Sequence, residues 1–384
     1  MTQIDPGTPT WLRTHNDRTA YRLLLEHGPL TRARLGELSG MSKPTAAQML
    51  ARLERLELIG PVGEVSAGRG PNAMSYGVRT DHVTGVAISV LEHSIQAVVV
   101  DVADAEHPIV ELDLREPGRI RTPEGDVSAA VTAACAAAGM ETSSVSRVLI
   151  GVQAAVLEDD DELSFTDTLP GWPSRGARQR IEKALGYTVT LDNDVKLATM
   201  AERSVGAAGG TPGFALVWIG EGLGVGVDMG GVVHRGAFGG AGEIGYLEVP
   251  RSATALDPGA HDLTDLLGGP ATARLLGGRS LAEVLPGLAA DDAALDAIAD
   301  RVVMAMQPVL AVIDPAMIVL GGPTALAGGE PLAERVAARV DRVARPRLAI
   351  RMSTTGSQPV LLGARQQLVQ QIRDHLEAGI ASAV

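Results

Sequence analysis

The chain has 384 residues, of which 45% are hydrophobic and 3% aromatic, and its formal net charge is −13 at pH 7. This length predicts more than one domain, with cores built from Ala, Val, Leu and Ile. No run of about eighteen apolar residues occurs, and no apolar signal segment follows a basic start, so we expect a cytoplasmic protein without a membrane partner. The single cysteine, Cys135, excludes an internal disulfide and is expected to be a small buried side chain.

The first elements predicted along the chain are three helices with a tight turn between the second and third. The first helix is entered from residues 15–16 and broken by Gly28-Pro29. Thr31 can cap the second helix, and Ser39-Gly40-Met41 makes a tight turn. Ser42 caps the third helix, which has Pro44 in its first turn. Two helices joined by a short glycine-containing turn predict a helix-turn-helix.

The second helix of such a pair reads DNA bases in the major groove from its N-terminal half. In this half, Lys43 can meet guanine or a phosphate, Gln48 can pair with adenine, and Thr45 can contact a phosphate or a thymine methyl group. We therefore expect DNA-binding side chains at Arg32, Ser42, Lys43, Thr45, Gln48, Arg52 and Arg69.

The segment 61–76 holds several glycines and is expected to form a two-stranded wing whose tip carries Arg69, which can enter a narrow minor groove. Residues 1–80 contain 10 Lys and Arg against 7 Asp and Glu, whereas the rest of the chain contains 23 against 39. A locally basic end on an acidic chain is typical of a DNA reader. The alternative is a small helical domain that only packs on its neighbour.

Strands and helices alternate after residue 80. We predict strands over residues 83–90, 95–102, 148–156, 189–191, 214–219, 225–229 and 318–320, and helices over 127–138, 175–185, 194–205 and 293–314. Loops are expected at 206–213 and 268–278, and the acidic run 158–162 is expected to be a solvated hairpin tip rather than a metal site. Two strand-rich segments, each followed by helices, predict a duplicated α/β architecture with a cleft between two lobes.

Several of these segments resemble the ROK family, which comprises bacterial repressors and sugar kinases of one fold. They are GVAISVLEHSIQAVVVD at 85–101, LDNDVKLATMAE at 191–202, IGEGLGVGVDMGGVVHRGAFGGAGEIGY at 219–246 and DPAMIVLGG at 314–322. The resemblance implies an α/β chain with an N-terminal winged helix-turn-helix (residues 1–80) and a two-lobed, actin-like ATPase fold (residues 81–384). It also implies that the body binds an effector, and we expect the body to form the dimer because the head is small.

The phosphate and zinc sites of the family are not kept. Ala87 and Ser89 stand at or near positions where the kinases have an aspartate and glycines, and Glu221 replaces the usual threonine. Because a carboxylate near a phosphate site repels the phosphate, we expect no ATP binding. No cysteine follows Gly245-Tyr246, so we expect no zinc site, no other cofactor and no catalytic residue. His261-Asp262 is expected to be a cap or a hydrogen-bonded pair, and the glycines at 222, 224 and 226 are expected to serve backbone packing.

The sugar cleft of the family is partly kept. By resemblance, Asn193 and Asp194 face the ligand, with Asp194 at the position of the kinases' base, and Glu243 matches an acid that binds hydroxyl groups. Tyr246 stands for a histidine and Thr264 for a glutamate of the family pattern. These five residues are the expected ligand-binding set, although Asn193-Asp194 can equally be a helix N-cap.

The leading hypothesis is a sequence-specific transcriptional regulator, expected to be a repressor, that senses a sugar or sugar derivative and has no kinase activity. The expected partners are a palindromic double-stranded DNA operator, a sugar-like effector and further copies of the chain, as a dimer or a dimer of dimers. One alternative is a sugar kinase with a DNA-binding head. Another is a regulator that has lost its small-molecule effector and responds to a protein partner.

Overall fold

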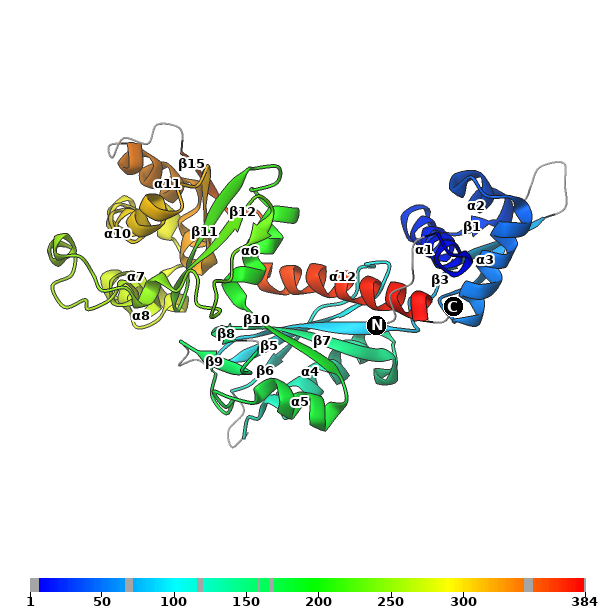
Figure 1. Cartoon of the computed structure of the whole chain (residues 1–384). Helices are drawn as coiled ribbons and strands as arrows, with labels where there is room; N and C mark the ends of the chain where they lie inside the picture. Colours follow the sequence, from blue (N-terminus) through cyan, green and yellow to red (C-terminus); the bar gives the residue numbers. More distant parts are fainter. Residues whose placement is uncertain are drawn as a thin grey trace.

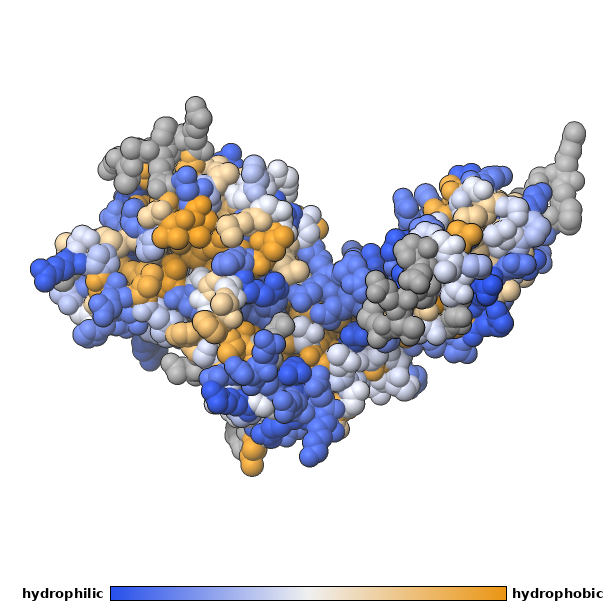
Figure 2. Space-filling view, in the orientation of Figure 1, coloured by the Kyte–Doolittle hydropathy of each residue, from blue (hydrophilic) through white to orange (hydrophobic). Residues whose placement is uncertain are grey.

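The chain folds into a small head and a larger two-lobed body (Figure 1). The computed structural model describes residues 7–65, 72–115, 120–157, 159–165, 169–341 and 348–382. The head stands apart from the body in the space-filling view (Figure 2). The last helix, α12 (Pro359–Ser382), runs along the lower lobe from the junction of the lobes to the head (Figure 1).

Three helices and a three-stranded antiparallel sheet form the head. In chain order they are α1 (Pro9–His27), β1 (Leu30–Thr31), α2 (Arg32–Ser39), α3 (Lys43–Arg55), β2 (Ile59–Val65) and β3 (Ala73–Val78), with strand order β1-β3-β2. The hydroxyls of Thr31 and Ser42 accept hydrogen bonds from backbone N–H groups in the first turns of α2 and α3. Gly40 ends α2 with φ 68°, a conformation that favours glycine. The predicted caps and turn are therefore confirmed.

The lower lobe contains a five-stranded mixed sheet covered by helices on both faces. Its strands are β4 (Thr84–Val90), β5 (Ser94–Val100), β6 (Val110–Asp113), β7 (Val145–Val152) and β10 (Thr188–Asn193), in the order β10-β7-β4-β5-β6. One face packs on α4 (Pro123–Ala138) and α5 (Ala177–Leu185), and the other packs on α12. Cys135 of α4 is buried in this core, as expected.

The upper lobe repeats this topology. Its strands are β11 (Gly213–Ile219), β12 (Leu223–Met229), β13 (Val232–Val233), β14 (Met317–Gly321) and β15 (Ala349–Met352), in the order β13-β12-β11-β14-β15. Its core packs on α10 (Asp292–Val312) and α11 (Gly322–Asp341), with α7 (Leu263–Leu267), α8 (Gly269–Leu275) and α9 (Leu281–Val284) beside them. In each lobe a three-stranded antiparallel meander is extended by two parallel strands, so the predicted duplication is confirmed.

Between the two sheets lies α6 (Asp194–Ser204), whose side chains are buried along most of its length. A Cβ on Gly226 of β12 would lie 1.7 Å from the Thr199 hydroxyl, so only glycine lets α6 pack this closely. This confirms the packing role expected for Gly226. At the other end of α6, the buried Glu202 accepts hydrogen bonds from Ser353 and Thr355, which precede α12.

Some sequence predictions were wrong. The first helix begins at Pro9 with Thr8 as its cap, because its early buried positions, including Thr14 and Asp17, are polar and hide the helical pattern. The segment predicted as a loop at 268–278 contains α8, flanked by glycines and opened by Pro270. The strand predicted at 148–156 is two strands, because the chain leaves the sheet after Val152.

The second of these strands, β8 (Ala155–Leu157), pairs with β9 (Glu162–Ser164). The acidic run therefore lies in a hairpin, as predicted, although Glu158 falls outside the described residues. Asp161 is not solvated. It is buried and accepts hydrogen bonds from Arg178 N and Gln179 N at 3.0 and 2.9 Å, at the start of α5.

The head is held together by an internal ion pair and tied to the body by a second one. Arg52 of α3 donates two hydrogen bonds, 2.7 and 2.6 Å long, to Asp17 of α1, whose carboxylate is almost fully buried. Arg22 of α1 bonds both carboxylate oxygens of Glu377 on α12, and Arg18 donates to the Glu377 carbonyl at 3.0 Å. The position of α1 on α12 is thus fixed by directed bonds.

Replacing Arg52 with Ala should weaken the head strongly, because it leaves the buried Asp17 carboxylate without its cation. Losing one partner of a buried pair costs roughly 3 kcal/mol or more. The expected result is faster amide hydrogen exchange across α1 and α3 in the full-length chain. Arg55→Ala is the matched control, since Arg55 lies exposed on the same helix. Equal exchange in the two variants would contradict a stabilising role for the pair.

Candidate functional site

The first half of α3 presents a row of polar side chains to solvent. Ser42, Lys43 and Gln48 are exposed, and the half-buried Thr45 lies 2.8 Å from Ser42, hydroxyl to hydroxyl. The opposite face of α3, including Met49, is buried in the head. The helix therefore holds these side chains on a rigid frame and points them outward.

The three arginines predicted beside them lie in different surroundings. Arg32, at the start of α2, donates to the Tyr76 hydroxyl at 3.0 Å and lies over its ring. Arg52 is committed to Asp17, so we withdraw it from the DNA-binding set: a guanidinium that holds a buried carboxylate cannot leave it cheaply for a phosphate. Arg69, predicted at the tip of the wing, lies outside the described residues.

A second cluster of polar side chains lies where β10 runs into α6, between the lobes. Asp194 is the first residue of α6, is only 9% exposed, and accepts a hydrogen bond from Val195 N at 2.8 Å. Burial, together with the nearby charge of Glu243, raises the pKa of Asp194 to about 7. Around neutral pH this carboxyl group can therefore both donate and accept hydrogen bonds.

Asn193 caps α6, as one of the two sequence interpretations proposed. Its side-chain oxygen accepts from Lys196 N at 3.1 Å, and its amide nitrogen donates to the Ala154 carbonyl at 3.0 Å. Both ends of the side chain therefore hold the backbone in place. The role that the structure gives Asn193 is to position Asp194.

Lys196 was missed in the sequence, although it lies at the centre of this cluster. Its side chain is buried and its ammonium donates to the Gly239 carbonyl of the upper lobe. Burial lowers its pKa, and the charges of Asp192 and Glu243 oppose this shift. The signal was available: a lysine in the first turn of a helix opposes the helix dipole, so it needs other partners.

Glu243, Tyr246 and Thr264 come from the upper lobe. Burial raises the pKa of Glu243, and Lys196 lowers it, so Glu243 lies near the cluster. Tyr246 is half exposed and packs on Phe165 of the lower lobe. A Cβ on Gly245 would lie 2.4 Å from the Thr264 hydroxyl, so Thr264 packs directly on this segment. The fold thus brings these predicted residues together at the lobe junction.

The positions that, by the resemblance, would hold phosphate in a kinase are buried or carry carboxylates. Ala87 and Ser89 are buried within β4. Burial and the nearby negative charge of Glu92 raise the pKa of Glu221, and His93, which lies 3.6 Å from the Glu92 carboxylate, opposes this shift. Such a pair of carboxylates repels a phosphate group.

Metal ligation receives no support from the described part of the chain. There, no three His, Cys, Asp or Glu side chains are grouped so that they could hold an ion. Asp262 caps α7 by accepting a hydrogen bond from Asp265 N at 2.8 Å, which confirms the cap expected at His261-Asp262.

The described residues contain no helix long and apolar enough to cross a bilayer.

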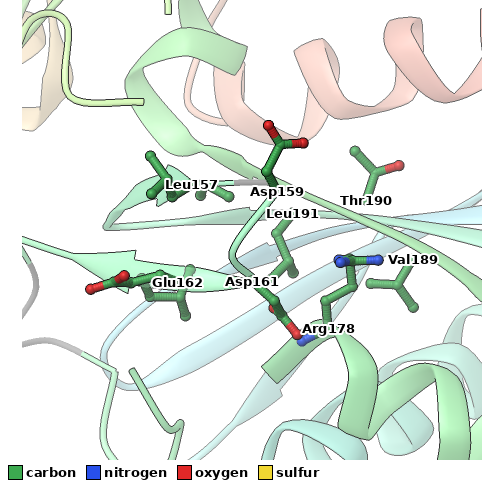
Figure 3. Close-up of a pocket in the computed structure, with 10 residues that line it drawn as sticks. Leu157, Asp159, Asp161, Glu162, Arg178, Val189, Thr190 and Leu191 are labelled. Atoms are coloured by element: carbon green, nitrogen blue, oxygen red, sulfur yellow. The ribbon is translucent and has the colours of Figure 1, made fainter. Parts of the chain in front are cut away.

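A cavity of about 350 Å³ lies away from this cluster, beside the β8–β9 hairpin and β10. Figure 3 shows Asp159, Asp161, Glu162 and Arg178 around it. Three of these are already engaged: Asp161 caps α5, Arg178 pairs with Glu182 at 3.6 Å, and Glu162 pairs with Arg175 at 2.7 Å. The cavity shares no lining residue with the Asp194 cluster.

Comparison with known proteins shows which family this chain is similar to. Residues 94–268 match the ROK family. The xylose repressor of Bacillus subtilis is 22% identical over 249 residues, which cover 64% of this chain and 63% of that protein. A ROK family transcriptional regulator, described as a homologue of the Escherichia coli MLC protein, aligns with 96% of this chain and 99% of its own, with a TM-score of 0.68 and 18% identity.

A ROK glucokinase from Streptomyces griseus, solved with glucose and AMPPNP, aligns with 75% of this chain and 99% of its own, with a TM-score of 0.60 and 21% identity. Residues 94–268 of this chain are therefore similar to a ROK family domain, and the chain has the two-lobed fold of these ROK structures. The chain spans just under two thirds of the length of the repressors that it matches.

Substituting Asn for Asp194 should change how stability depends on pH. The pKa of Asp194 is 3.8 when the chain is unfolded and about 7 when it is folded. Its contribution to the free energy of unfolding is therefore full below pH 3.8 and is lost as the pH rises to 7. The free energy of unfolding of Asp194→Asn, measured relative to wild type, should therefore increase by about 2–3 kcal/mol as the pH rises from 5 to 8. Urea unfolding at both pH values measures this gain. Asp160→Asn, an exposed site, should show none.

Proposed function

We propose that the chain is a sequence-specific DNA-binding transcriptional regulator, acting as a repressor, whose body senses a sugar or sugar derivative. The observation that carries this proposal is the exposed polar face of α3 in a capped helix-turn-helix, on a body whose phosphate positions are acidic. The repressor names of its relatives agree with it.

The proposed DNA surface consists of Ser42, Lys43, Thr45 and Gln48, with Arg32 beside them and Arg69 on the wing. One such surface covers only a few base pairs, so we propose that a dimer, or a dimer of dimers, binds a palindromic operator in the cytoplasm.

The proposed effector site consists of Asp194, Glu243, Tyr246 and Thr264, held by Asn193. Carboxyl and hydroxyl groups of this kind suit the paired hydroxyls of a carbohydrate. Lys196 adds a cation that balances the acids.

A continuous path of packed elements joins this site to the head. Asp194 begins α6, Glu202 near its end bonds the segment before α12, and Glu377 of α12 holds Arg22 of α1. A ligand that prefers one arrangement of the lobes can therefore shift the head through α12. Operator DNA must then weaken effector binding by the same factor by which the effector weakens DNA binding.

A sugar kinase with a DNA-binding head is the second candidate. One observation favours it: Asp194 is kept at the position of the kinases' base, with its pKa raised towards neutrality. Phosphoryl transfer also requires a bound metal–nucleotide complex. The carboxylates of Glu92 and Glu221 oppose one, which makes the regulator the better candidate.

Replacing Lys43 or Gln48 with Ala should weaken specific DNA binding by roughly 1–3 kcal/mol for each base that the side chain no longer binds. The operator is first selected from random DNA with the wild-type chain, and the affinities are then measured by gel shift. Arg55→Ala controls for loss of positive charge elsewhere on α3. Unchanged binding in both test variants would refute this reading surface.

The regulator hypothesis also predicts that the chain has no measurable ATP affinity and phosphorylates no sugar. Glu221→Thr, which restores the usual residue of the family, should not be sufficient to create activity, because Ala87 and Ser89 remain. Titration calorimetry with Mg-ATP and a coupled ADP-release assay across monosaccharides test both statements. Turnover by the wild-type chain would establish the kinase instead.

A further inference from the structure

Two aromatic rings from different lobes meet beside the Asp194 cluster. Phe165 directly follows β9 of the lower lobe, and Tyr246 belongs to a short 3-10 helix of the upper lobe, Ile244–Tyr246. Their ring centroids are 4.9 Å apart and the ring planes are tilted by 50°. Each residue keeps 49% of its surface exposed, so the pair presents apolar faces to solvent.

The backbone around this pair is arranged to bring the rings together. Phe165 has φ 53°, a left-handed conformation that is strained for a bulky side chain and that persists only where the surroundings impose it. The upper-lobe loop lies close against this hairpin: a Cβ on Gly239 would be 2.0 Å from the Val156 carbonyl oxygen, and one on Gly240 would be 3.7 Å from the Phe165 ring.

Aromatic residues are few in this molecule, and among the described residues Phe165, Phe238 and Tyr246 are the exposed ones. The sequence has only three Phe, four Tyr and three Trp. Phe214, for comparison, is fully buried in the core. Two half-exposed rings in contact across the lobe junction are therefore poorly explained by core packing, and exposed apolar patches of this kind commonly mark binding sites.

Polarity changes from the interior of this junction to its surface. Asp194 and Lys196 are buried, Glu243 is partly buried, and Tyr246 and Phe165 are half exposed. Glu243 and Tyr246 are only three residues apart, so the polar and aromatic parts adjoin. A ligand whose hydroxyls reach the acids would extend outward over the rings.

We propose that Phe165 and Tyr246 form an outer subsite that stacks on the second ring of a glycoside, so that the effector is a disaccharide or an aryl glycoside rather than a free monosaccharide. The C–H groups on one face of a pyranose, like an aryl ring, are apolar and pack well on aromatic side chains. This inference rests on the proposed sugar-sensing function and names the class of ligand.

The test compares the full-length wild type with Phe165→Gly and Phe238→Ala. Glycine adopts φ 53° without strain, so Phe165→Gly removes the ring while keeping the backbone conformation. Phe238 is 77% exposed on the adjacent loop and serves as the matched control for loss of an exposed ring. The probes are glucose, galactose and xylose, their phenyl glycosides, and cellobiose, lactose and xylobiose, each titrated by calorimetry.

In at least one series, the two-ring ligand should bind wild type about tenfold tighter than its monosaccharide, which is about 1.4 kcal/mol. Phe165→Gly should abolish this advantage and leave the monosaccharide affinity unchanged, and Phe238→Ala should keep it. A gain limited to phenyl glycosides identifies an aryl group as the second ring, and a gain limited to disaccharides identifies a sugar.

Three results would overturn the proposal. The first is that two-ring ligands still bind Phe165→Gly more tightly than monosaccharides do. The second is that Phe238→Ala loses this preference as fully as Phe165→Gly. The third is that monosaccharides bind wild type as tightly as the two-ring ligands. In the last case the sugar-sensing function would still stand. If no probe bound at all, both the outer subsite and the sugar-sensing function would fall, while DNA binding would remain a separate measurement.

Discussion

The packing of α12 is the constraint on which the rest of the structure depends. Its apolar side chains, among them Leu368, Ile372 and Ile380, are buried against the lower lobe and the head. Its start is joined to α6 through Glu202, and Glu377 near its end bonds two arginines of α1. One helix therefore contacts the lower lobe, α6 between the lobes, and α1 of the head.

Buried charges occur where elements must be held in one relative position. Asp17 fixes α3 on α1, Asp228 binds Arg203 between β12 and α6, and Asp192 of β10 binds Arg235 of the upper lobe at 2.6 Å. Each pair joins segments that are distant in the sequence. Desolvation makes such pairs poor sources of net stability. An arrangement that separates the two partners leaves a buried charge uncompensated, which costs free energy, so the pairs favour one relative position of the elements that they join.

The body keeps the fold of a sugar kinase and changes the chemistry of its cleft. The positions that would meet a nucleotide are buried within β4 or carry carboxylates, whereas the side that we propose to bind hydroxyl groups has Asp194 and Glu243. Phe165 lies outside the motifs by which the resemblance was identified, whereas Lys196 and Tyr246 lie within them. All three lie where the lobes meet, which is where selectivity for a ligand would be coupled to lobe movement.

The sequence by itself determined the elements whose signals are local. The caps at Thr31 and Ser42 and the turn at Gly40 depend on neighbouring backbone groups, and the duplicated strand pattern depends on hydrophobic periodicity. The tertiary structure alone decided the role of Arg52, which a partner on another helix removes from the DNA-binding set, and of Asn193, whose side chain both caps α6 and bonds Ala154. It also decided the contact of Phe165 with Tyr246. Such roles depend on which distant segments the fold brings within a few ångströms, and this information is not contained in the spacing of residues along the chain.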